Sequence, residues 1–151
     1  MSKIDEILDL QDDSKIILGI SQFVNGKMGA EADLNNLSAP EKVFVYIDYL
    51  DRQVNNGGFH QFFFNSTGEY AHEVLDAYEA IGAHKTADII ERAIKLFPVL
   101  PIPKDTLVRR TVMLDLTEEI EDAWNSLDDE FYKYEDDVLR LLIEFLRSNN
   151  K

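Results

Sequence analysis

The sequence contains no cysteine, and this absence removes several kinds of chemistry at once. A disulfide framework, a cysteine-based zinc site and a thiol nucleophile are all excluded. The 151 residues do not need such cross-links, because a domain of that length buries about 70% of the surface that its unfolded chain exposes. The absence of cysteine also fits a reducing compartment.

Long hydrophobic runs are missing as well. No stretch of about 18 consecutive apolar residues occurs, so we expect no membrane-spanning helix and no contact with a membrane. Residues 1–13 carry acids throughout and lack a long apolar centre, which does not fit a signal peptide. We therefore expect a cytoplasmic protein.

Basic residues are scarce. The chain has 15 basic and 29 acidic side chains, which gives a formal net charge of −14. Such a chain repels phosphates, so direct binding of nucleic acid is not expected, whereas basic partners are favoured. Acidity also serves solubility alone, and the composition does not separate these two interpretations.

Complete catalytic and metal-binding motifs are absent too. The sequence has three histidines and contains no glycine-rich phosphate loop, nucleophile elbow or His-Glu-x-x-His motif. Glu69 and His72 have the Glu-x-x-His spacing of di-iron helical bundles, but the second copy that such sites need does not occur. His60 lies among phenylalanines and is expected to be a packed or rim residue. We therefore expect no catalytic residue, no bound metal and no cofactor.

The apolar residues that are present recur at helical spacing. After residue 37, Ser38 and Glu41 have the spacing of a capping box. One face of a helix then follows in Val43, Ile47, Leu50 and Val54. Comparable patterns appear in residues 3–9, 15–25, 66–83, 84–97, 104–116, 117–127 and 136–146, and no sustained period of two occurs. The prediction is an all-α fold, with six to nine helices and short connections in a single domain spanning residues 1–151.

Some helix boundaries are predicted from individual residues. Gly26 and Gly29 indicate a loop between the N-terminal helices and residue 38. Ser66 or Thr67 is expected to cap the helix of residues 66–83, and Asp128 is expected to cap a further short helix. The last helix, residues 136–146, is predicted to turn these apolar residues inward: Val138, Leu139, Leu142, Phe145 and Leu146.

In residues 57–63, two consecutive glycines are followed directly by a cluster of phenylalanines. Gly57 and Gly58 follow a helix whose exit favours a residue with positive φ. Phe59, Phe62 and Phe63 then share one face of a short helical turn. We predict that Gly57 or Gly58 has positive φ and that Phe62 or Phe63 is buried. The aromatics are interpreted as core residues rather than as a ligand cage.

Residues 38–146 resemble a small bacterial, all-helical family of unknown function that includes a DNA-mimic protein. The likeness rests on a signature made of Asn56, Gly57, Gly58, Phe59, Phe62, Phe63 and Asn65, with Gln61 inside it. The helix break at 81–83, the segment 96–98 and the acidic segment 127–137 also belong to it. The resemblance implies a helical fold and no known catalysis for the family as a whole. One member imitates the charge surface of DNA and occupies a DNA-binding protein.

Mimicry would depend on surface carboxylates rather than on this signature. Residues 115–137 hold eleven acids and one base, a local charge of −10 out of the total of −14. Like charges at helical spacing destabilise a helix by about 0.2–0.5 kcal/mol per pair. The concentration of acids in this segment therefore needs an explanation. Negative charge at helix N-termini is one explanation, and a basic partner is another. The predicted partner-binding residues are Asp115, Glu118, Glu119, Asp122, Asp128, Asp129, Glu130, Asp136 and Asp137.

The sequence thus favours a non-enzymatic domain that binds a basic protein, such as a DNA-binding protein or transcription factor. The alternative is a helical adaptor or scaffold module that binds through an apolar surface, with acidity serving solubility only. Both a monomer and a homodimer are compatible with the sequence.

Overall fold

The computed structural model describes residues 2–149 and has the all-α fold that the sequence predicts. Within these residues there are eight α-helices, two short 3-10 helices and no strand. The α-helices are α1 (Lys3–Leu8), α2 (Asp13–Met28), α3 (Ala39–Phe64), α4 (Ala71–Ala80), α5 (His84–Lys95), α6 (Thr106–Met113), α7 (Glu118–Phe131) and α8 (Val138–Asn149). The 3-10 helices are η1 (Leu34–Asn36) and η2 (Ser66–Tyr70).

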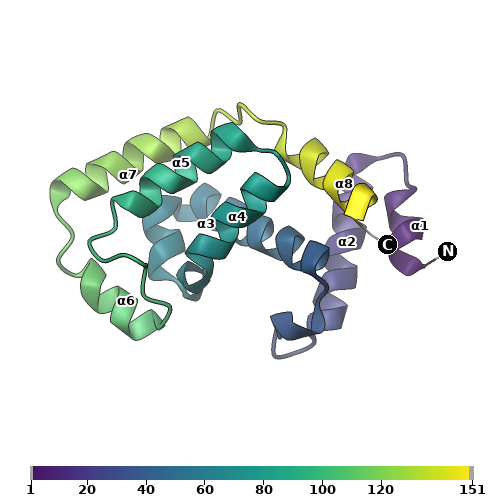
Figure 1. Cartoon of the computed structure of the whole chain (residues 1–151), viewed down its shortest axis with the longest axis horizontal. Coiled ribbons are helices and arrows are strands. Elements are labelled where there is room, and N and C mark those ends of the chain that lie inside the picture. The colour runs from purple at the N-terminus through teal and green to yellow at the C-terminus, as the bar shows by residue number, and fades with distance from the viewer. Residues whose placement is uncertain (1, 150–151) are drawn as a thin grey trace.

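Helix α3 is the central element of the fold. Its predicted capping box is confirmed: Ser38 Oγ accepts a hydrogen bond from the Glu41 N–H, and Glu41 Oε1 accepts one from the Ser38 N–H at 2.8 Å. The helix contacts α4, α6, α7 and α8, and α5 lies across α4 and α7 (Figure 1). Of its predicted face, Ile47, Leu50 and Val54 are buried, and Val43 is half-buried against the core.

A kink divides α3 at the two glycines, and both predictions for this stretch are confirmed. Gly58 has φ +76°, whereas Gly57 has φ −158°, an extended value. Helical geometry resumes in residues 59–64, where Phe59, Phe62 and Phe63 are at most 1% exposed. Phe63 packs against Phe59 and Phe62 and also against two aromatics from remote segments, Phe97 and Trp124. The kink therefore allows the aromatic segment to enter the core immediately after the turn.

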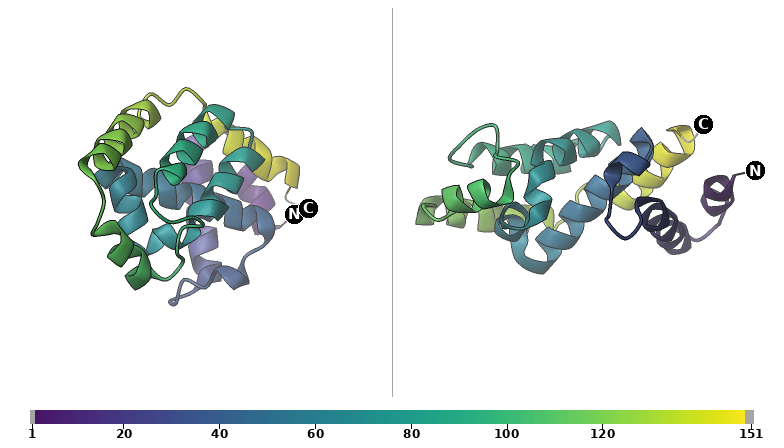
Figure 2. Two further views of the ribbon diagram at one scale, coloured as in Figure 1. Left: turned by 60° about the vertical axis from the view of Figure 1, so that its left-hand side comes forward. Right: turned by 90° about the horizontal axis from the view of Figure 1, so that it is seen from below.

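The N-terminal helices pack at one end of the molecule beside α8, where both termini lie (Figures 1 and 2). The loop predicted at Gly26 is wrong, because α2 continues to Met28. Its buried face repeats every four residues through Ile16, Ile20, Val24 and Met28, and this burial outweighs the low helix propensity of glycine. The chain leaves the helix at Gly29, where φ is +74°.

Three other local predictions are also corrected. The side chains of Ser66 and Thr67 do not cap α4, because η2 comes first and Thr67 Oγ1 donates to the Phe62 carbonyl at 3.0 Å. Leu139 is 40% exposed, and Ile143 takes the predicted inward position instead. No short helix begins at Asp128, because α7 runs to Phe131 and contains it.

Candidate partner-binding surface

Four of the predicted partner-binding acids lie at the N-terminal end of α7 or directly before it. They are Asp115, in the turn that precedes the helix, and Glu118, Glu119 and Asp122, within the helix, and we call them the α7 stripe. All four side chains are exposed, and none makes a hydrogen bond or ion pair with another side chain in the described part of the chain. Thr117 caps the helix by accepting from the Ile120 N–H.

The first turn of α7 contains three acids, including Glu118 and Glu119. Negative charge is stabilised at this position by the free N–H groups of a helix N-terminus. The stripe is therefore compatible with the fold without any partner, although Asp122 lies beyond the first turn. Asp129, two helical turns after Asp122, is also exposed and extends the acidic side of the helix.

The other four predicted acids accept bonds from donors of this chain, and we call them the inner acids: Asp128, Glu130, Asp136 and Asp137. Asp128 Oδ1 accepts from the Phe59 N–H at 2.8 Å, directly after the kink glycine Gly58. Asp136 Oδ2 accepts from the N–H and the hydroxyl of Thr86 at 2.7 and 3.0 Å. These contacts satisfy backbone donors at the starts of two helical segments.

Glu130 and Asp137 form ion pairs with arginines. The Arg92 guanidinium donates to both oxygens of Glu130, at 2.8 and 3.0 Å, and Arg140 lies 3.4 Å from Asp137. The Arg92 hydrogen bonds lower the pKa of Glu130. Burial instead raises the pKa of Asp128, and the neighbouring Asp129 charge adds to that rise against the opposing Phe59 N–H bond.

The polar residues of the signature form a network around the kink. Gln53 Oε1 accepts from the side-chain amides of Gln61 and Asn65, at 2.8 and 2.9 Å. Asn56 Nδ2 donates to Gln61 Oε1 at 3.2 Å. These contacts connect the two segments of α3, so the signature has a structural role in this fold.

A buried arginine of α6, which contacts the end of α3, was not foreseen from the sequence. Arg109 is fully buried and donates to the carbonyls of Phe63, Asn65, Pro103 and Lys104. Gly68 is required beside it, because an added Cβ would meet both the Arg109 guanidinium and the Phe63 carbonyl. No local pattern distinguishes Arg109 from its exposed neighbours, so only the tertiary structure reveals this contact.

Among the described residues, the most exposed large apolar side chains lie in α6 and at its C-cap, Leu114. Leu107 and Leu114 are 73% and 81% exposed, and Val108 is also exposed. The Arg110 guanidinium lies 4.4 Å from the ring centroid of Phe64, at the edge of this surface. Leu107 and Leu114 are seven residues apart, a spacing that places them on one face. Leu114 directly precedes the α7 stripe.

The histidines do not assemble a metal centre in the described residues, where no group of three or more potential ligands lies together. His72 Nε2 accepts from the Ile102 N–H at 3.1 Å, which orders the connection after α5. His60 stacks on Phe64 with ring centroids 6.0 Å apart, as expected for a packed or rim residue. Across residues 2–149, no helix combines the length and apolarity that crossing a membrane requires.

Comparison with known proteins identifies one family. Residues 35–149 match the family described as DMP19-like protein, a range slightly wider than the 38–146 expected from the resemblance. Searches of curated proteins and of solved structures each returned no match. Because the match covers well over half of its residues, this chain belongs to the DMP19-like family.

Proposed function

We propose that this chain is a non-enzymatic protein-binding domain whose α7 stripe occupies the basic surface of a DNA-binding protein, in the manner of a DNA mimic. One observation carries the proposal. The α7 stripe is exposed and unpaired, whereas the inner acids beside it are held by donors of the same chain. The carboxylates of the stripe are thus available to a partner.

Geometry and family membership support this function. Neighbouring positions on a helix face lie about 5–6 Å apart, a spacing comparable to that of charges along a nucleic-acid backbone. Asp129 continues the line of charge along α7. Membership of the DMP19-like family agrees with a protein-binding role. The inner acids contribute to the negative field in this proposal without direct contact with the partner.

The test is a charge reversal with a matched control. The stripe variant replaces Glu118, Glu119 and Asp122 by lysine. The control places lysine at Asp13, Glu31 and Asp76, which are exposed and lie outside the stripe. Both variants change the net charge equally. Proteins are captured from an extract of the native host on each immobilised variant, eluted with a salt gradient and identified.

We expect the wild type and the control to retain the same basic protein and the stripe variant to lose it. Elution at moderate salt is expected, because charge-driven contacts weaken as salt rises. The captured protein should then be unable to hold its DNA and this chain together. Equal loss in both variants would contradict a specific stripe, and a ternary complex with DNA would contradict mimicry.

The second candidate function is an adaptor that binds through the apolar face of α6. The exposure of Leu107 and Leu114 favours it, because solvent-exposed leucines on one face are a feature of docking helices. Replacing both leucines by glutamine should abolish a salt-insensitive interaction and leave the folded structure intact. Retention of all captured proteins by this variant would remove the α6 face from consideration.

A further inference from the structure

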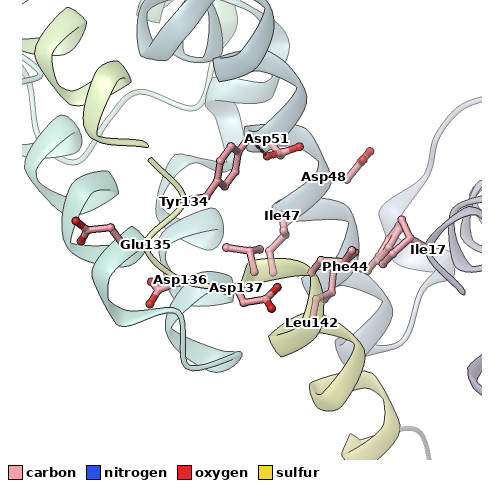
Figure 3. Close-up of a pocket in the computed structure, with 12 residues that line it drawn as sticks. Ile17, Phe44, Ile47, Asp48, Asp51, Tyr134, Glu135, Asp136, Asp137 and Leu142 are labelled. Carbon is pink, nitrogen blue, oxygen red and sulfur yellow. Dashed lines mark hydrogen bonds between the residues drawn. The ribbon is translucent and has the colours of Figure 1, made fainter. Parts of the chain in front are cut away.

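A groove of about 630 Å³ lies between α3 and α8 and is bordered by the segment that joins α7 to α8. Small-molecule sites in proteins commonly measure about 300–1,000 Å³, so its size suits one small ligand. It lies away from the α7 stripe, none of whose residues line it. Figure 3 shows α3 side chains on one side of it and side chains of residues 134–142 on the other.

The floor of the groove is apolar. Phe44 and Ile47 from α3 and Leu142 from α8 are buried residues whose side chains form it. Ile17 from α2 closes one end, and the exposed Leu139 contributes to its edge. Leu139 was predicted to point inward, but it is exposed and lines this groove.

The walls carry carboxylates from two separate elements. Asp48 and Asp51 come from α3, whereas Glu135, Asp136 and Asp137 come from the segment before α8 (Figure 3). Within residues 2–149, neither lysine nor arginine lines the groove. A ligand here would therefore meet negative charge on two sides of an apolar surface.

The negative charges of several of these acids are neutralised only in part by neighbouring groups. Asp48 and Asp137 pair with Arg52 and Arg140, which are exposed side chains outside the groove lining. Asp51 Oδ1 accepts from the Tyr134 hydroxyl at 3.0 Å and from Asn55 at 3.2 Å. Burial raises the pKa of Asp51, and the nearby Asp48 charge raises it further against these hydrogen bonds. A cation beside Asp51 would stabilise its ionised form.

We propose that this groove binds a linear aliphatic diamine, with its alkyl chain on the Phe44–Ile47–Leu142 floor and its ammonium groups against the carboxylates of the two walls. An ammonium at each end of the alkyl chain suits a groove whose acids come from two different elements. The apolar floor disfavours small inorganic cations, because it would displace their water without replacing it. Anionic ligands, including fatty acids, are repelled by the same walls.

The binding test uses cadaverine, with pentylamine and pentanediol as controls that have the same number of carbon atoms. Titration calorimetry gives the affinities, and amide chemical shifts locate the site. We expect cadaverine to bind at a single site, more tightly than either control, with shifts centred on Ile47, Tyr134 and Leu139. Equal binding of pentylamine would contradict the need for two ammonium groups, and shifts centred elsewhere would contradict the site.

Variants distinguish the groove from general attraction to an acidic protein. Asp51→Asn keeps an acceptor for Tyr134 and removes one charge, and Asp137→Asn removes a charge from the other wall. Each should weaken cadaverine binding about fivefold, as expected for one partly exposed ion pair of roughly 1 kcal/mol. Asp76→Asn removes the same charge from an exposed position outside both the groove and the α7 stripe and should leave the affinity unchanged. Equal loss in all three variants would overturn the proposal.

The floor and the nature of the ligand are tested separately. Leu139→Asn changes an exposed edge residue, so it should fold normally and weaken cadaverine binding with no change in net charge. If this variant binds as the wild type does, the alkyl chain does not contact the apolar edge of the groove and the proposal fails. Tighter binding of an oligolysine peptide than of cadaverine at the same shifts would identify a protein-docking surface instead, and would overturn a small-ligand site.

Discussion

The α7 stripe and the inner acids have similar side chains, lie within 23 residues of each other and serve different purposes in the fold. The side chains of the stripe make no hydrogen bond or ion pair within the described chain, whereas every inner acid accepts from a donor. Three of these donors are remote, on residues 69, 38 and 50 positions away from Asp128, Glu130 and Asp136. A run of acids in a sequence is therefore not equivalent to an acidic surface.

The largest expected effect comes from crowding an inner acid. Gly58 and Gly82 both have positive φ, but an added Cβ would meet the Asp128 carboxylate only at Gly58, whereas Gly82 has open space. Gly82→Ala should cost about 1–2 kcal/mol from backbone strain alone. Gly58→Ala should cost more than about 2 kcal/mol, because Asp128 must also shift. Chemical denaturation measures both, and equal costs would show that Asp128 does not constrain the kink.

Removing the acceptor at the kink should have the next largest effect. Asp128→Ala leaves the Phe59 N–H without its partner and should cost about 1–3 kcal/mol of unfolding free energy. Asp128→Asn keeps an oxygen acceptor and should cost much less. The exposed neighbour gives the control, since Asp129→Ala should stay within about 0.5 kcal/mol of wild type. If alanine is tolerated equally at both positions, the distinction between inner and exposed acids is lost.

Asp136 should behave as a remote cap of α5. The residue before that helix, Ala83, provides no side-chain cap, and Asp136 accepts from the Thr86 N–H instead. Asp136→Ala should therefore cost about 0.5–2 kcal/mol, the range for loss of an N-cap. Glu135→Ala serves as the control, because its side chain is exposed and makes no hydrogen bond or ion pair in the described residues. Thermal melts compare the two, and a larger loss for Glu135→Ala would reverse the assignment.

Within the α7 stripe, two single reversals should have small effects of opposite sign. Glu119→Lys places a positive charge in the first turn and should cost about 0.3–1 kcal/mol. Asp122→Lys lies beyond that turn and relieves repulsion with Glu118 and Glu119, so it should stabilise by about 0.2–0.5 kcal/mol per pair. Denaturation at low ionic strength resolves the difference. Stabilisation by Glu119→Lys would show that repulsion exceeds the effect of the helix terminus.

The smallest effect is a contrast in pH dependence between two inner acids. The raised pKa of Asp128 means that its contribution to stability is fully present below its unfolded pKa and is lost as pH rises through the folded pKa. The lowered pKa of Glu130 gives a contribution that is present above the unfolded pKa and is lost as pH falls through the folded pKa.

Stability relative to wild type should consequently change in opposite directions across the acidic range. As pH rises, Asp128→Asn should gain and Glu130→Gln should lose, and denaturation at several pH values measures both trends. Parallel trends would mean that the Arg92 pair is not maintained in solution.

Much of the fold is predictable because it depends on local patterns. The spacing of Ile47, Leu50 and Val54 specifies a buried helix face, and a helix exit with paired glycines specifies a positive φ. The family resemblance is likewise supported by the match over residues 35–149. These features are set by residues within a few helical turns of one another.

The features that could not be predicted from the sequence depend on hydrogen-bond partners that are distant along the chain. Asp128 is a residue type that commonly caps a following helix, yet its carboxylate accepts a hydrogen bond from the Phe59 N–H, in a different part of the chain. From the spacing of acids in the sequence, Asp136 is predicted to be exposed like its neighbours. That spacing does not reveal that Thr86, 50 residues earlier, donates hydrogen bonds to its carboxylate. Whether any of the nine predicted acids contacts a partner stays a prediction, since partner contact is not encoded in spacing or in the fold of one chain.

The buried Arg109 has a consequence for a protein that lacks cysteine. Its guanidinium joins the end of α3 to the connection that precedes α6, through backbone oxygens on Phe63, Asn65, Pro103 and Lys104. Segments more than forty residues apart in sequence are thereby tied at one point. Like a disulfide, this set of hydrogen bonds connects segments that are distant in the sequence. It has no redox chemistry, so reductants and oxidants leave it unchanged. Lysine could not replace it, because a single ammonium lacks the planar fork that reaches several carbonyls at once.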